Sequence, residues 1–299
     1  MHDAARRKMR RRAAFGRLGG TVEAFGDAFA GGRQQGKFVS EQTSAPQTFV
    51  QRFRGARSGR FERAQGGAGA RNRGIEQVQT PFVASVDDDC IVEKDWLENI
   101  ERLLHQHPMA IITGRVEPAG DGMPLSVVTS TVPCVHRRSS VRIINPMPSG
   151  NMGFALRTAL RIGPFDENLP TAEDIDWGYR ALRIGVPIIY APEIVVYHCH
   201  CRNEAQTVTI YRAYAWGLGA FYGKHLRRGD WSMLLRIAIS LYRAVTSIIS
   251  GVLNKDYSKR AVGRSRLTFL LPGLVVGLRG RGLSKMSLPS RNASSSSRS

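Results

Sequence analysis

The feature that most constrains the fold is a short apolar run that ends in three consecutive aspartates. Residues 82–86 are apolar or small, a pattern typical of a buried strand, and Asp87, Asp88 and Asp89 follow directly. Pro81 separates this strand from a predicted helix over residues 69–79. Ligands of open α/β sheets bind beyond the carboxyl ends of strands, so this strand end is a candidate site.

Strands and helices alternate from about residue 66 to residue 200. Residues 95–105 carry apolar side chains at helical spacing, and Pro108 stops that helix. The pattern then predicts strands over 110–116, 187–190 and 194–198, a short helix over 154–162, and a helix over 173–184 that ends at Gly185. Such alternation predicts an α/β sheet.

The C-terminal third has a different character. Residues 205–226 and 231–253 predict helices, whereas the apolar segment 267–278 is interrupted by Pro272 and Gly273. Only 231–253 approaches the roughly 20 apolar residues that a membrane span needs. Arg236 and Arg243 make crossing costly, so we favour a helix that lies in the membrane interface or packs on the domain.

Both ends of the chain are basic. The formal charge is +19, with 16 Lys and Arg against 5 Asp and Glu in residues 1–74, and 10 against 1 in residues 255–299. Basic ends suit nucleic acid or an acidic membrane leaflet, and solvated tails are the plain alternative. We expect residues 1–65, rich in Gly, Arg, Gln and Ala, and the Ser-rich tail 284–299 to be disordered.

Residues 1–12 are basic, but no apolar run typical of a secretory signal follows them. We therefore expect the four cysteines to be reduced thiols in a cytosolic compartment.

Two acidic groups could carry chemistry. On an extended chain Asp87 and Asp89 point the same way, and two carboxylates on one face suit Mg²⁺ or Mn²⁺; an acidic turn before the helix at Asp95 is the alternative. Glu173 and Asp174 begin a predicted helix. They could serve as a general base, or only meet the helix dipole favourably.

A run of alternating histidines and cysteines, residues 198–201, follows the last predicted strand. The two residue types would lie on opposite faces, which is awkward for a four-ligand zinc site. His198 could instead complete an oxygen-rich metal site or be a satisfied core histidine. The Gly-rich basic segment 66–74 lacks the Gly-Lys-Ser/Thr sequence that ends a P-loop. Together with the arginines before it, it resembles an Arg/Gly-rich tail that binds nucleic acid.

Taken in order, several segments of the sequence resemble the family 2 glycosyltransferases. The matching segments are residues 69–75, 82–90, 149–154, 163–167, 173–185 and 192–198. The resemblance implies a GT-A core, of the Rossmann-like nucleotide-diphospho-sugar transferase type, over 66–204, followed by C-terminal amphipathic helices over 205–283. It also implies a metal-dependent, inverting hexosyltransferase-type enzyme of cell-envelope polysaccharide synthesis.

The resemblance assigns roles by position. Asp87 and Asp89 match the DxD motif that holds the metal, Mg²⁺ or Mn²⁺, on the donor diphosphate, and His198 matches a histidine of the same site. Asp174 matches the catalytic base, with Glu173 as the second candidate. Two further pairs match donor-binding segments: Arg71 and Asn72 at the nucleotide, and Gly150 and Asn151 beside the donor sugar and acceptor.

The implied partners are a nucleoside-diphosphate sugar and a saccharide or lipid-linked acceptor. From the C-terminal helices we expect a cytoplasmic protein that can contact the inner face of the plasma membrane. Family members begin with a strand–helix–strand unit that binds the base and ribose, and residues 1–65 show none of it. A displaced reading frame or a misplaced start would produce this pattern, so we expect an incomplete core and impaired activity. The alternatives are a basic nucleic-acid-binding protein and a non-catalytic membrane-surface protein.

Overall fold

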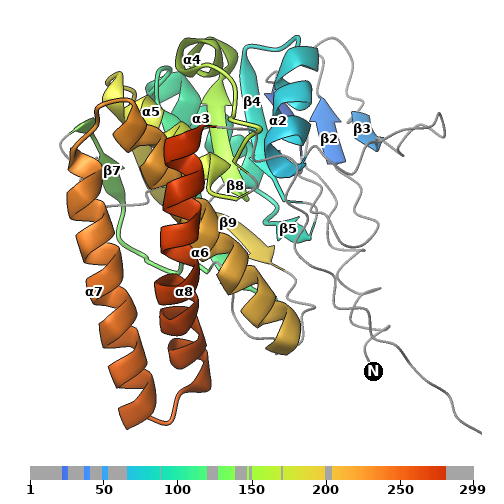
Figure 1. The fold of residues 1–299 in the computed structure, drawn as a ribbon. Helices are drawn as coiled ribbons and strands as arrows, with labels where there is room; N and C mark the ends of the chain where they lie inside the picture. The colour runs from blue at the N-terminus through green and yellow to red at the C-terminus, as the bar shows by residue number, and fades with distance from the viewer. Residues whose placement is uncertain are drawn as a thin grey trace, which may run out of the picture.

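The computed structural model describes residues 66–87, 89–119, 127–138, 147, 150–169, 171–198 and 204–280, and the backbone of three short strands before them. The strands form one mixed sheet in the order β3-β2-β1-β4-β8-β6-β9-β5, and β7 pairs with β9 (Figure 1). Their bounds are β1 Val22–Phe25, β2 Lys37–Ser40, β3 Phe49–Arg52, β4 Phe82–Val86, β5 Cys90–Val92, β6 Ile111–Pro118, β7 Cys134–His136, β8 Asn151–Ala155 and β9 Ile188–His198.

Strand direction places several loops at one edge of the sheet. β4 runs parallel to β1, and β6 runs parallel to β9. β8 lies between β4 and β6 and is antiparallel to both. The carboxyl ends of β4, β6 and β9 therefore meet the amino end of β8 at the same edge.

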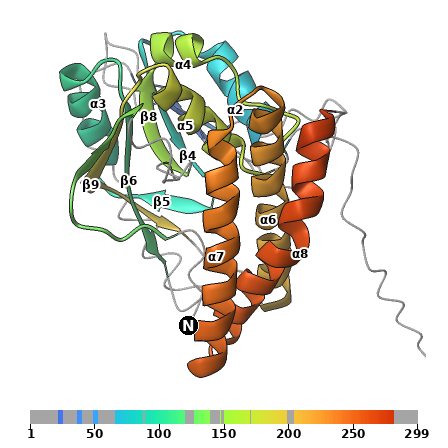
Figure 2. The ribbon, with the colours of Figure 1, turned by 60° about the vertical axis from the view of Figure 1, so that its left-hand side comes forward.

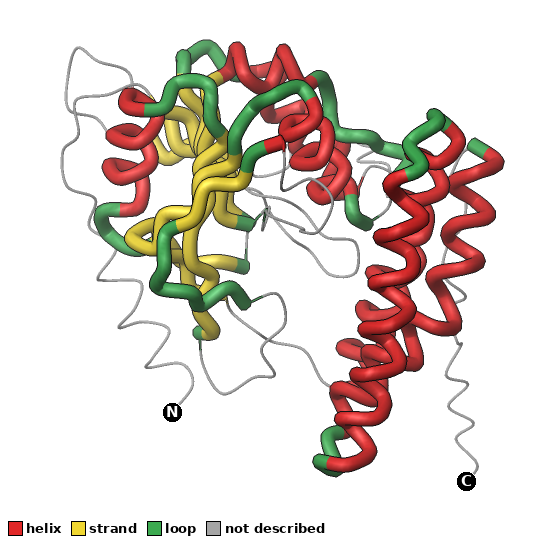
Figure 3. Tube along the Cα trace, turned by 90° about the vertical axis from the view of Figure 1, so that its left-hand side faces the viewer, coloured by secondary structure: helices red, strands yellow, loops and turns green. Residues whose placement is uncertain are grey.

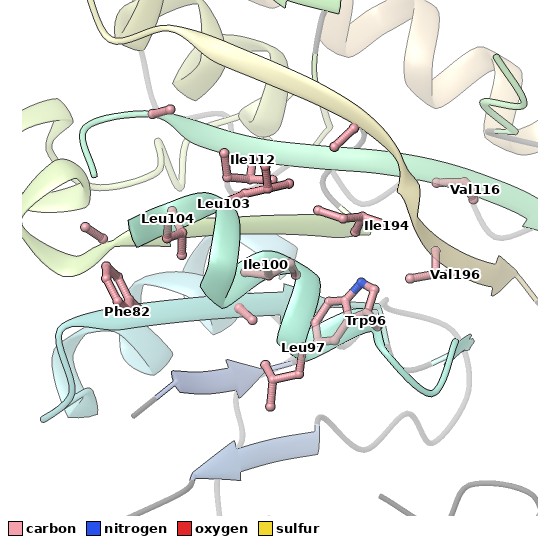
Figure 4. Close-up of a cluster of buried hydrophobic side chains, with 14 of the residues drawn as sticks. Phe82, Trp96, Leu97, Ile100, Leu103, Leu104, Ile112, Val116, Ile194 and Val196 are labelled. Atoms are coloured by element: carbon pink, nitrogen blue, oxygen red, sulfur yellow. The ribbon is translucent and has the colours of Figure 1, made fainter. Parts of the chain in front are cut away.

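Helices cover both faces of the sheet (Figure 2). On one face α3 (Trp96–Gln106) buries Trp96, Leu97, Ile100, Leu103 and Leu104 against the strands (Figure 4). On the other face α2 (Gly66–Gln77), α4 (Leu156–Ile162) and α5 (Glu173–Arg183) enclose a second core around Phe154 and Trp177. The sheet thus has apolar packing on both sides, as the α/β prediction requires.

Most predicted elements are confirmed, with differences near β8 and β9. The segment before α4 is a fully buried strand, β8, where the sequence predicts a loop that leads into a helix. β9 is one strand of 11 residues rather than two. Both differences arise from pairing with β6, a long-range contact that local periodicity does not report.

The prediction that residues 1–65 contain no strand is wrong for three segments. β1 pairs with β4 from Val22↔Phe82 to Phe25↔Ser85, and β2 and β3 continue the sheet beyond it. The physical reason is the open edge of β4, whose backbone groups can recruit even a weakly strand-forming segment. The rest of residues 1–65, and the Ser-rich tail, lie outside the described residues.

Strand β9 contains a bulge where it pairs with β6. The register between β6 and β9 shifts between Gly114 and Arg115, so that residues 192–194 arch over Gly114. A Cβ atom at Gly114 would lie 2.1 Å from the Ile194 carbonyl oxygen. Glycine is therefore required here by close backbone approach.

Gly114→Ala is expected to destabilise the protein by about 1–3 kcal/mol, because the bulge must move to admit a methyl group. Chemical denaturation measures the loss. Gly178→Ala in α5 is the matched control, since a Cβ there would lie 3.4 Å from its nearest neighbour, the Ile188 Cδ1 atom. Equal stability of the two variants would contradict the steric argument.

Three long helices follow the core: α6 (Glu204–Arg227), α7 (Ser232–Leu253) and α8 (Tyr257–Arg279). They stand to one side of the sheet, away from α3 (Figure 3). α6 and α8 touch backbone to backbone: Cβ atoms at Gly219 and Gly223 would lie 2.0 and 2.2 Å from the carbonyl oxygens of Leu270 and Leu274. Small residues at such contacts are typical of helices that pack closely in membranes.

The expected interruption at Pro272 does not occur. α8 runs through Pro272 for 23 residues from Tyr257, and the N-cap residue Asp256 accepts a hydrogen bond from the Lys259 amide. Gly273 and Gly277 lie against the α6 backbone on the following turns. This packing holds the helix together despite the hydrogen bond that the proline removes.

Candidate active site

Asp87, Gly150 and His198 lie where the strand directions converge. Asp87 directly follows β4, Gly150 directly precedes β8, and His198 ends β9. A Cβ atom at Gly150 would be only 2.5 Å from the Asp87 Oδ2 atom. Glycine at position 150 is therefore what allows the Asp87 carboxylate to sit against this loop.

Arg71 joins α2 to the same edge. Its side chain is 1% exposed, and Nη1 donates a 2.8 Å hydrogen bond to the Glu173 Oε1 atom at the start of α5. Its Nη2 atom lies 3.9 Å from the Asp87 Oδ1 atom. One buried guanidinium thus links the acidic start of α5 to the aspartate after β4.

The carboxylates outnumber the cations at this edge. Burial raises the pKa of Asp87, Arg71 opposes the rise, and the negative charges of Asp89 and Asp174 add to it. Burial likewise raises the pKa of Glu173. The positive charge of Arg71 opposes this rise, and the negative charge of Asp174 adds to it. Crowded carboxylates of this kind are costly without a further cation.

Asp89 and His198 form the second part of the site. The His198 Nε2 atom lies 3.2 Å from the Asp89 Oδ1 atom, and His198 is 7% exposed. Cys90 pairs with His198 across β5 and β9, and ligand atoms of Asp89, Cys90 and His198 lie within 4.8 Å of one another. Sequence reasoning missed Cys90; its position directly after the three aspartates was the available signal. Cys199, His200 and Cys201 lie outside the described residues.

Asn72 and Asn151 are engaged within the protein. Asn72 accepts from the Phe165 amide and donates to the Phe165 carbonyl, which clamps the turn before α5. Asn151 is 0% exposed; its amide donates to the Arg115 and Ile194 carbonyls and accepts from the Trp96 indole. These hydrogen bonds give both asparagines a structural role. Their contacts with the nucleotide-sugar donor stay predictions.

Asp174 is the more accessible carboxylate at the start of α5. Its Oδ1 atom accepts from the Ile175 amide, and the side chain is half-buried, whereas Glu173 is 5% exposed and paired with Arg71. Ala172, just before the helix, has φ of 69°, a strained conformation for alanine. Asp174 is thus half-buried and close enough to Asp87 and Glu173 to act on both electrostatically.

Helix α6 supports that turn from behind. The Thr171 hydroxyl donates to the Ala213 carbonyl at 2.9 Å, and a Cβ at Gly217 would meet the Thr171 Oγ1 atom at 1.9 Å. The C-terminal helices therefore contact the segment that carries the predicted base. The helical spacing of residues 205–226 gave no sign of this contact.

A buried charge network fixes α5 to α6, and the sequence did not reveal it either. Asp176 is 0% exposed, and its Oδ1 atom accepts from Lys224 Nζ at 2.7 Å and from His225 Nε2 at 2.8 Å. Its Oδ2 atom accepts from Arg180 Nε at 2.8 Å. Lys224 also contacts the Asp166 Oδ2 atom at 2.7 Å. The network holds the scaffold beneath the site.

A family comparison bears directly on this edge of the sheet. Residues 45–161 match the family described as Glycosyl transferase family 2. The matched segment is less than half of the chain, and it is similar to the family 2 glycosyltransferases. The match begins before residue 66, where the sequence resemblance starts, and it covers Arg71, Asp87, Asp89 and Gly150 but ends before Glu173 and His198.

Curated relatives agree on the enzyme class. The chain is 26% identical over 144 residues to a pre-mycofactocin glycosyltransferase of Mycobacterium tuberculosis, covering 46% of this chain and 31% of that protein. It is 26% identical over 137 residues to glycosyltransferase AglE of Haloferax volcanii, covering 46% and 44%. The chain thus spans less than half the length of these glycosyltransferases.

Solved structures of low similarity include residues 1–349 of S. aureus TarS in complex with UDP-GlcNAc. It is 16% identical, with a TM-score of 0.39, over 72% of this chain and 73% of that one. GalNAc-T7 with UDP, GalNAc and Mn²⁺ is also 16% identical with a TM-score of 0.39, over 56% of this chain and 38% of that one.

Proposed function

We propose that this glycosyltransferase domain moves a sugar from a nucleoside-diphosphate sugar to an acceptor hydroxyl with inversion at the anomeric carbon. The observation that carries the proposal is the convergence of Asp87, Asp89, Asp174 and His198 at one edge of the sheet, beyond the ends of β4 and β9. Ligand sites of α/β sheets lie at such edges.

The residues present fit a divalent cation. The Asp87 Oδ1 atom is buried and has no hydrogen-bond partner, which leaves one oxygen available to a metal. Asp89 and His198 offer a second oxygen and an imidazole nitrogen nearby. Oxygen-rich sets of this kind suit Mg²⁺ or Mn²⁺, whereas the Cys90 sulfur is a softer ligand that these ions do not favour.

Asp87, Asp89 and His198 would hold the ion, which when bound neutralises charge on the departing nucleoside diphosphate. Arg71 holds Glu173 and lies near Asp87, so it keeps both carboxylates in place. Asp174, the less buried member of the pair at the start of α5, accepts the proton from the acceptor hydroxyl as it attacks. Buried and paired Glu173 orients this turn.

Thermal denaturation with UDP, GDP or dTDP, each with and without Mn²⁺, tests the donor site. We expect one nucleotide to raise the melting temperature only when Mn²⁺ is present. A ligand at 100 times its Kd adds about 2.7 kcal/mol of stability, which is readily measured. Asp89→Asn should abolish the joint shift because it removes a charged ligand of the metal.

Glu98→Gln is the matched control, since it removes one exposed carboxylate from α3. This variant should keep the full shift. Equal shifts in the Asp89 variant and in the unmodified protein would rule out the proposed metal site. Salt-sensitive nucleic-acid binding without any nucleotide effect would favour the basic-protein alternative.

The C-terminal helices favour a membrane-proximal acceptor. By length and composition α7 and α8 are apolar enough to cross a membrane. Their outward surface carries large apolar side chains: Leu234, Leu235, Tyr242, Val245, Ile249, Val252 and Leu253 on α7, and Leu267, Leu271, Val275 and Leu278 on α8. Exposed apolar surface of this extent is typical of a membrane or protein contact. We propose that the domain acts at a membrane surface on a saccharide or lipid-linked acceptor.

A further inference from the structure

Three arginines of α7 and α8 lie close enough to one tyrosine of α6 to act on it electrostatically. Arg236 and Arg243 lie two turns apart on α7, and Arg266 lies on α8. All three act electrostatically on the Tyr222 side chain of α6, although burial is the main cause that raises its pKa. The Tyr222 hydroxyl shares a 2.8 Å hydrogen bond with Ser240 of α7.

Arg236 is the buried member of this group. The residue is 7% exposed, and its Nε and Nη2 atoms are buried without a hydrogen-bond partner. Its guanidinium carbon lies 5.0 Å from the centre of the Tyr179 ring, which compensates part of the charge but none of the N–H groups. Buried unsatisfied donors on a cation are costly and call for a partner.

Asp230, the carboxylate that acts on Arg236, is already engaged with other side chains. Asp230 is close enough to act on Arg236, but it binds Arg183 Nη1 at 2.5 Å and also pairs with Tyr179 and Ser232. Within the residues that the structure describes, none of Arg236, Arg243 and Arg266 forms an ion pair. Each of the three therefore brings positive charge near Tyr222, and they differ in burial, from buried Arg236 to exposed Arg243.

We propose that Arg236, together with Arg266, Arg243 and Tyr222, binds a phosphate group between α6, α7 and α8. Guanidinium groups suit phosphate because their planar N–H forks match its oxygens. The phosphate comes from a lipid headgroup or from a free phosphate compound, and the apolar outer surface of α7 and α8 favours the lipid. The site is separate from the sugar-transfer residues and does not depend on their assignment.

Binding measurements with inorganic phosphate, and with phosphatidylcholine vesicles with and without phosphatidic acid, test the site on the full chain. Chloride at matched ionic strength is the reference. We expect phosphate, acidic vesicles or both to bind the unmodified protein. Arg236→Gln should weaken that binding about tenfold or more, because it removes charge-assisted hydrogen bonds. Binding to vesicles alone would identify the lipid as the source, and binding of phosphate alone would identify a free compound.

Arg264→Gln is the matched control: Arg264 is an exposed arginine one half-turn before Arg266 on α8, and its loss should change binding less than twofold. Arg266→Gln keeps the test valid if the Arg236 variant does not fold, and it should weaken binding severalfold. If the Arg264 variant lost as much binding as the Arg236 variant or the Arg266 variant, the binding would depend only on surface charge. That result would overturn the proposal. So would the absence of phosphate and acidic-vesicle binding in the unmodified protein.

Discussion

Asp176→Asn is expected to destabilise the protein by about 3–5 kcal/mol, because the change leaves buried cations without their counter-charge. Lys224, His225 and Arg180 all donate to the Asp176 carboxylate, and Lys224 and His225 are themselves buried. Lys224 would keep its contact with Asp166, whereas His225 would face an amide in place of a charge. Urea denaturation followed by circular dichroism measures the loss.

Asp256→Asn makes the same chemical change at a site that is much less buried. Asp256 begins α8 by accepting a hydrogen bond from the Lys259 amide, and asparagine fills that role equally well. The control should therefore unfold at the same urea concentration as the unmodified protein. If Asp176→Asn also unfolded there, the buried network would contribute nothing to stability.

The same network predicts an acid transition. Burial alone raises the pKa of Asp176, but the hydrogen bond from His225 and the charges of Lys224 and Arg180 outweigh burial and hold the pKa far below its ordinary value of 3.8. A depressed carboxyl pKa contributes stability above the unfolded value and loses it as pH falls below about 3.8. Stability of the unmodified protein should fall below that pH more steeply than that of Asp176→Asn.

Asp174→Asn is expected to lower kcat by about 10²–10⁴, because the amide cannot accept the proton of the attacking hydroxyl. Nucleotide and Mn²⁺ should still raise the melting temperature of this variant, since Asp174 lies outside the proposed metal ligands. Release of the nucleoside diphosphate, from the donor whose base the denaturation experiment identifies, measures kcat. The expected pattern is a rate defect with intact donor binding.

Glu173→Gln separates the two candidate bases. Glu173 is buried against Arg71, so its replacement should lower stability through the broken 2.8 Å ion pair. A large loss of kcat in Glu173→Gln at unchanged stability, with Asp174→Asn still active, would assign the base to Glu173 instead.

The sequence alone determined the local elements and the residues that converge. The aspartates after the apolar strand, the acidic start of the 173–184 helix and the histidine after the last strand were identifiable because each follows a local pattern. Their convergence at one edge follows from the rule that ligand sites lie at strand ends. Local pattern therefore predicted the α/β class and most of the cluster.

Tertiary structure decided what depends on residues distant in sequence. Of the strands before residue 66, β1 pairs with β4 and the other two extend the sheet from β1, whereas β8 forms between β4 and β6. The sequence also could not show that the amides of Asn72 and Asn151 hold a turn and a bulge. The charge network of Asp176 and the unpaired guanidinium of Arg236 likewise depend on which helices meet. Burial and partners are properties of packing, and no local pattern of residues encodes them.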